Sequence, residues 1–177
     1  MRPAAQRLAH FISEVPRVGL RQALANAGVK EVDELPPEQI ALAIADVLAT
    51  DASLLIQAEL RDALAMVLEK LCAGPTTLEQ AEQMLSESAG KLEGVVQMLF
   101  ESYIMERFKT FFCEHEAVKH GFDAADGILR QAREYISSEM ALERADRRDL
   151  TAIDWGSAEG AKIVDAILER TIAIYST

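Results

Sequence analysis

Residues 115 to 120 read HEAVKH and bring the ligands of a possible zinc site close together in the sequence. Zinc proteases of the HEXXH type need two histidines four residues apart, because that step brings both rings to one face of a helix. Here His115 and His120 are five residues apart, so at about 100° per residue they point roughly 140° away from each other. The spacing therefore argues against this motif. His115 instead falls on the apolar stripe that contains Phe108, and we expect it to point inward.

The opposite side of the same helix offers another interpretation. Cys113, Glu116 and His120 share that side, and a thiolate, a carboxylate and an imidazole are all zinc ligands. The side also carries Glu106 and Lys109, however, which is typical of a solvated face, and no fourth ligand is evident. We therefore expect no metal here, and an enzyme site built from the cysteine, glutamate and histidine remains the alternative.

Other catalytic patterns are missing from the sequence. It has no glycine-rich phosphate loop, no GXSXG nucleophile turn, no Rossmann fingerprint and no EXXH pair for a helical di-iron site. The stretch ERADRRD carries Arg144, Arg147 and Arg148, which could bind an anion, but the interleaved acids favour a self-paired surface loop. The sequence predicts a protein that is not an enzyme and holds no cofactor.

Charge is distributed unevenly along the chain. The total of -11 argues against direct nucleic-acid binding, because that affinity comes largely from Lys and Arg. Residues 1–30 nevertheless contain five cations and the single acid Glu14, a net charge of +4, which leaves -15 for the remainder. The five cations are Arg2, Arg7, Arg17, Arg21 and Lys30. We expect a basic first helix whose arginines bind an acidic body or partner, with a transit peptide as the alternative.

Two aromatic residues near the end of the chain are further candidates for partner binding. Trp155 is the only tryptophan and lies in IDWGSAEG, just before the last expected helix. Tryptophan is enriched at the centres of protein interfaces, although a single tryptophan in a connector can equally plug the end of a helical bundle. Tyr175 ends the last apolar helix and is the second candidate.

The spacing of apolar residues predicts an all-α fold, because they recur at steps of three and four along nearly the whole chain. We predict one compact bundle of seven to eight helices around a long central helix over about residues 91–120. Cys72 and Cys113 are too few for a disulfide framework, and no stretch reaches the roughly 18 uninterrupted apolar residues of a membrane span. These features predict a soluble cytoplasmic protein.

Proline, glycine and capping residues set the expected helix ends. The first helix should stop before Pro16, and the second should close at Gly28 in the left-handed conformation. A capping box beginning at Thr76 should start the fifth helix. Asp123 should cap the helix that follows the central one, and Leu142 should lie on the buried side of that helix.

Three stretches, at the start, centre and end of the chain, carry a resemblance to a known family. They read RLAHFISEVPRVGLRQALANAGV, YIMERFKTFF and IDWGSAEGAKIVDAILERTIAIY. They resemble, in turn, the entry to the helical region, the central helix and the closing segment of QatB proteins, which belong to the Qat antiphage defence cassette. The resemblance extends over essentially all 177 residues.

The resemblance implies a set of partners. The cassette also encodes an ATPase, a protein similar to the deazaguanine synthase QueC, and a TatD-like nuclease. By this resemblance the chain is a non-catalytic subunit, a protein-binding module or scaffold, and also a potential substrate for the QueC-like partner enzyme. A stand-alone helical adaptor is the alternative to a subunit.

The start of the chain departs from the family pattern. In the family a basic arm rich in Gly, Ser and Pro precedes the helical part, whereas this chain starts at MRPAAQRLAH. The resemblance therefore predicts that residues 1–177 form a single helical domain from the C-terminal part of a longer protein.

Overall fold

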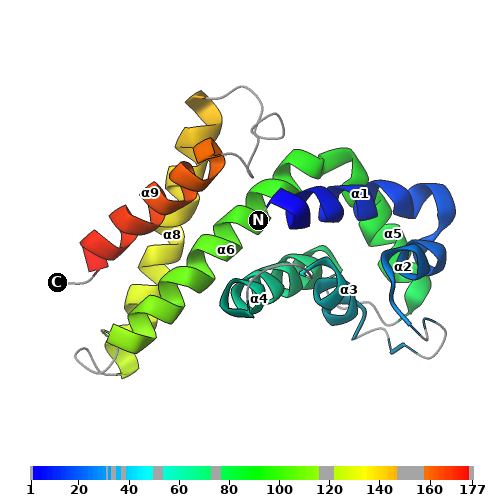
Figure 1. Ribbon diagram of the computed structural model, residues 1–177, viewed down its shortest axis with the longest axis horizontal. Helices are drawn as coiled ribbons and strands as arrows, with labels where there is room; N and C mark the ends of the chain where they lie inside the picture. The colour runs from blue at the N-terminus through cyan, green and yellow to red at the C-terminus, as the bar shows by residue number, and fades with distance from the viewer. Residues whose placement is uncertain are drawn as a thin grey trace. The chain divides into compact units, whose positions relative to one another are not determined.

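The computed structural model describes residues 2–30, 32, 35–36, 39–49, 54–72, 77–115, 122–146 and 158–175. Within these ranges the chain forms helices and no strands, so the predicted all-α fold is confirmed (Figure 1). The elements are α1 (Arg2–Val18), α2 (Leu20–Ala27), α3 (Ile40–Leu48), α4 (Leu54–Leu71), α5 (Leu78–Ser88), the short 3-10 helix η3 (Ala89–Lys91), α6 (Leu92–His115), α8 (Phe122–Asp146) and α9 (Ala158–Tyr175). None of these helices is long and apolar enough to cross a membrane.

The chain divides into two compact units, Met1–Leu99 and Phe100–Thr177. Helix α6 contributes its first residues to one unit and the rest to the other. The sequence analysis expected one domain, and whether the two units unfold together as one domain stays a prediction.

The first unit packs α1 against α2 and α5, and α3 against α4. Its core is mainly aliphatic and includes the aromatic residue Phe11, and the pairing of Arg61 on α4 with Asp46 on α3 adds an exposed ionic contact. Helix α1 does not stop before Pro16 but continues to Val18. The proline lies in the last turn, where only the bond to the fourth residue before it is lost, and the backbone N–H of Gly19 closes the turn by donating to the Val15 carbonyl at 2.9 Å.

Two predicted caps are wrong, and one predicted helix end is confirmed. Helix α5 is capped by Thr77 rather than Thr76: its hydroxyl accepts from the backbone N–H of Gln80 at 3.2 Å, three residues on. Asp123 lies inside α8, which already begins at Phe122. Gly28 closes α2 in the left-handed conformation, with φ 99°, as predicted.

Helix α6 is the predicted long central helix. Its 24 residues carry buried side chains on every side, which is typical of a helix that lies inside a core. The buried residues are Val95, Val96, Leu99, Phe100, Ser102, Tyr103, Ile104, Met105, Glu106, Phe108 and Phe112.

In the second unit α9 runs back along α8 and also contacts α6 (Figure 1). The guanidinium of Arg107 on α6 donates to the carboxylate of Asp165 on α9 at 2.9 Å. Arg170 of α9 pairs with Glu139 of α8 at 2.6 Å. Both pairs are partly exposed, so they contribute to helix orientation more than to stability.

One predicted core residue of this unit lies on the surface. Leu142 was expected on the buried side of α8, but its side chain is 61% exposed, whereas Ile136 and Met140 are buried as expected. Leu142 is two residues beyond Met140, about 200° further around the helix, and therefore falls on the outer face.

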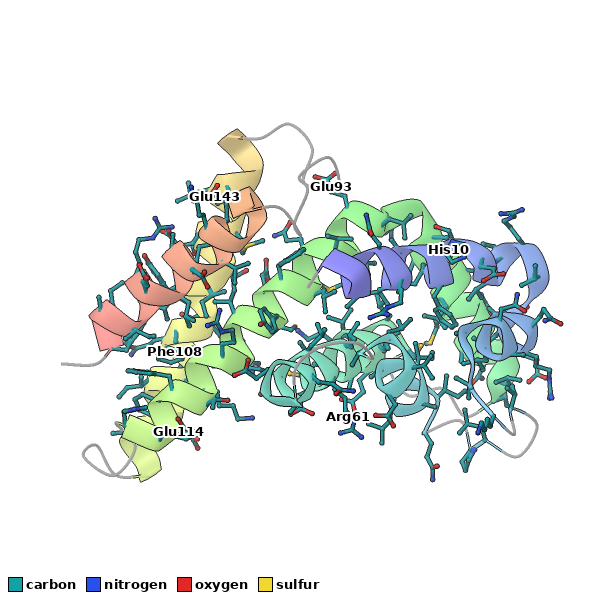
Figure 2. All side chains as sticks on the ribbon, in the orientation of Figure 1. His10, Arg61, Glu93, Phe108, Glu114 and Glu143 are labelled. Atoms are coloured by element: carbon teal, nitrogen blue, oxygen red, sulfur yellow. The ribbon has the colours of Figure 1, made fainter. Side chains whose placement is uncertain are left out.

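We expect Phe108→Ala to destabilise the protein by about 3–5 kcal/mol. Phe108 is fully buried, stacks on Phe112 with ring centroids 5.8 Å apart and meets the edge of Tyr175 at 6.1 Å (Figure 2). The matched control, Leu142→Ala, should change the free energy of unfolding by about 0.5 kcal/mol or less, because that side chain is exposed. Urea unfolding followed by circular dichroism measures both, and similar losses would contradict the described core.

Candidate functional site

The structure places the first residue of HEAVKH on the surface. His115 is the last residue of α6 and is exposed, so the prediction that it points inward was wrong. Its ring stacks on that of Phe111 with centroids 4.6 Å apart, and its Nδ1 lies 2.9 Å from the Phe111 carbonyl oxygen and donates to it in the corresponding tautomer. Helical spacing gave the direction of the ring correctly relative to Phe111, but none of the described helices covers His115.

The side of α6 that carries Cys113 is only partly solvated. Glu106 was expected to be exposed, yet it is 9% exposed, with one carboxylate oxygen 3.5 Å from the ammonium of Lys109. Lys109 and Cys113 are exposed, although Phe108 and Phe112, directly before each of them, are buried, so the two residues lie on the outward face of this part of the helix. Within the described part of the chain no group of three metal-binding side chains comes together. Glu116 and His120 lie outside the described residues.

The two thiols differ in accessibility. Cys72 is buried at the end of α4, and burial raises its pKa to about 11. A thiol in such surroundings is unreactive near neutral pH. Cys113 is the exposed thiol.

Two of the candidate arginines, Arg17 and Arg21, flank the turn between α1 and α2. Gly19 adopts φ 83° and ψ 157°, a conformation that is essentially restricted to glycine. It has no side chain to cap α2, and a carboxylate from α5 takes that role: the backbone N–H of Leu20 donates to Oε2 of Glu82 at 2.8 Å. The negative charge also suits the positive end of the helix dipole. Glu82 therefore fixes the start of α2 from a position 62 residues away.

The exposed side chains at this turn form a patch that we call the elbow surface. It consists of Pro16, Arg17, Val18, Arg21 and Gln22, all of which are exposed. Val18 is 44% exposed, which makes it one of the few large aliphatic residues that the described helices leave in solvent. The patch therefore combines positive charge with a small apolar area.

The acids around the elbow surface are engaged in other contacts. Glu14, the only acid of residues 1–30, accepts a hydrogen bond from Nδ2 of Asn26 at 2.7 Å and lies 3.9 Å from Nε2 of His10. Glu79 has a lowered pKa, mainly because its carboxylate accepts from its own backbone N–H and from Thr77, and to a smaller extent because Arg21 is near. The positive charge of Arg21 is thus partly offset.

The remaining candidates for partner binding differ in position. Arg7 is half-buried on α1, and Arg2 begins that helix, its side chain lying outside the described part. Trp155 also lies outside the described residues. Tyr175 is half-buried, and burial followed by the negative charge of Glu134 raises its pKa. Its ring already packs on α6, so it holds α9 within the second unit.

Comparison with known protein families identifies the family of the chain. A family model described as Qat anti-phage system associated protein QatB matches residues 1–175. The chain belongs to the QatB family. The match extends over all described helices of both units, as the resemblance predicts, and makes the chain a component of a Qat antiphage defence system. Comparisons with curated proteins and with solved structures find no match.

Sequence analysis selected the arginines of the QatB chain but not the turn that presents them. The contact between Leu20 and Glu82 joins residues far apart in sequence, and no local pattern indicates it. The sequence PRVGL does contain a usable signal, because a proline followed three residues later by a glycine indicates that a helix ends there and the chain changes direction.

We expect Gly19→Ala to lower the free energy of unfolding by about 1–3 kcal/mol, because a side chain disfavours this backbone conformation. The space around the added Cβ is not the cause, since its nearest neighbour would be Oε2 of Glu82 at 3.5 Å. Gly94→Ala is the matched control: Gly94 lies in α6 with nothing within 4 Å of its Cβ position, so the change should stabilise by about 0.5–1 kcal/mol. Urea unfolding of both variants measures the difference, and an unaffected Gly19→Ala protein would contradict the described turn.

Proposed function

We propose that this QatB protein is a non-catalytic, protein-binding subunit of its Qat system and docks its partner through the basic elbow surface. The observation that carries the proposal is that Arg17, Val18 and Arg21 are all exposed at one turn. Glu82 holds this turn in place through its hydrogen bond to Leu20. Arginine is enriched at protein interfaces, and a preformed surface loses less conformational entropy when it binds.

The QueC-like protein of the same cassette is the partner we propose, with the cassette ATPase and the TatD-like nuclease as further members of the assembly. The net charge of -11 supports a protein partner over direct nucleic-acid binding. A cytoplasmic location fits this role, because the components would then assemble where phage nucleic acid enters. Under this proposal Tyr175 supports the packing of the second unit and does not contact the partner directly.

We expect the purified chain and the purified QueC-like protein to elute together in size-exclusion chromatography at micromolar concentrations. The double variant Arg17→Glu/Arg21→Glu should shift the two proteins to separate peaks, because it replaces two cations by two anions on the elbow surface. Arg130→Glu/Arg133→Glu, which changes two exposed arginines of α8 by the same charge, is the control and should leave the joint peak intact. Separate elution of the unmodified chain from every cassette protein would refute a binding role.

The non-catalytic part of the proposal has its own test. Cys113 is the exposed thiol of α6 and would be the nucleophile or metal ligand of the alternative enzyme site. We expect Cys113→Ser to retain full protection against phage in cells that express the whole cassette, because an exposed helical cysteine contributes little to folding. The variant His120→Ala is measured beside it. Loss of protection with unchanged protein abundance in either variant would favour an enzyme.

A further inference from the structure

The elbow surface has the chemistry to recognise carboxylates. Arg17 and Arg21 lie on either side of Gly19, and both guanidinium groups belong to exposed residues. A guanidinium binds a carboxylate with two parallel hydrogen bonds, which makes arginine more selective for this group than lysine. Arg17 is exposed, and among the described residues no hydrogen bond or ion pair involves it.

Val18 adds a requirement that charge alone does not impose. It is flanked in sequence by Arg17 and by the Gly19 turn, and it is 44% exposed. Covering an aliphatic side chain requires an apolar group on the partner. An occupant that satisfies the whole surface therefore carries carboxylates beside at least one apolar side chain.

The distribution of charge favours a protein as the source of those carboxylates. Outside residues 1–30 the chain carries -15, so a long polyanion that reached the two arginines would also meet a repulsive surface. A short acidic segment of a protein can contact the two arginines without extending over the rest of the surface, and Glu79 offsets the charge of Arg21 only in part. A sugar-phosphate backbone also offers no apolar side chain to cover Val18.

We propose that the elbow surface is a docking site for an acidic protein segment that pairs its carboxylates with Arg17 and Arg21 and covers Val18. This inference rests on the proposed binding function and adds the chemistry of the occupant. The turn is suited to the task because the Leu20–Glu82 hydrogen bond at 2.8 Å and the conformation of Gly19 fix the start of α2 before any partner arrives.

Carbodiimide crosslinking of the assembled complex tests the chemistry directly, because this reagent joins an amine to a carboxylate in direct contact. The full chain with Arg17→Lys/Arg21→Lys is mixed with the purified QueC-like protein, the ATPase or the TatD-like nuclease, treated with carbodiimide and analysed by mass spectrometry. We expect crosslinks from residue 17 or 21 to Asp or Glu side chains of a segment that also contains an apolar residue. The matched control is Arg130→Lys/Arg133→Lys on α8, which should give no such crosslink.

Binding measurements separate this inference from the proposed function. We expect Arg17→Glu/Arg21→Glu to weaken association by about tenfold or more and Val18→Asp to weaken it similarly, with a steep loss of affinity as salt increases. Arg130→Glu/Arg133→Glu should leave the affinity within about twofold. Association that survives the elbow variants overturns the docking site but leaves the binding function intact. Absence of association for the unmodified chain overturns both.

A photo-crosslinking amino acid in place of Val18 provides the last discrimination. We expect it to label the same acidic protein segment in the complex. Labelling of a single-stranded oligonucleotide or of lipid in anionic vesicles, each added as a competitor, overturns the assignment to a protein.

Discussion

One hydrogen bond in the first unit joins elements that the chain order keeps apart. The carboxylate of Glu82 on α5 accepts the backbone N–H of Leu20, the first residue of α2. The glycine before it cannot supply a cap, and without this carboxylate the positive end of α2 would lack its anionic partner. Helix α1 packs on both α2 and α5, so the hydrogen bond between Glu82 and Leu20 also helps to set the orientation of α2 relative to α1. The position of Arg17 relative to Arg21 depends on it.

The second unit relies on a different kind of constraint. Its α9 carries a buried apolar stripe that includes Ile163 and Ile167, and it is oriented at its edges by ion pairs to α6 and α8. The apolar contacts supply most of the stability, since partly exposed ion pairs contribute little. The aromatic contact of Phe108 with Tyr175 lies at the end of this stripe, so this candidate for partner binding takes part in internal packing.

The period of the apolar residues was sufficient to predict the helices, because most of them bury one side and the spacing of that side is fixed by geometry. It was not sufficient to predict what covers that side. His115 was expected inside and Glu106 outside for the same reason: a helical projection gives the direction of a side chain around its own axis, whereas burial depends on neighbouring elements. Leu142 is a different case, because the helical projection itself places it on the outer face of α8. The candidate site shows the same division. Its arginines are visible as a charge imbalance, while the turn that presents them depends on a contact between distant residues.

Membership of the QatB family identifies the biological system in which the chain acts. The charge of the elbow surface indicates which chemical groups it can bind. An overall charge of -11 would make most encounters with an acidic partner unfavourable, so a locally basic patch is the condition for binding one at all. The elbow surface can bind external carboxylates only if nearby carboxylates of the same chain do not neutralise its arginines. Glu14 on α1 and Glu82 at the turn each accept a hydrogen bond from an amide, of Asn26 and of Leu20 respectively, whereas Glu79 lies near Arg21. Amide partners satisfy these acids without consuming a guanidinium, and this arrangement leaves the positive charge of Arg17 for an external carboxylate.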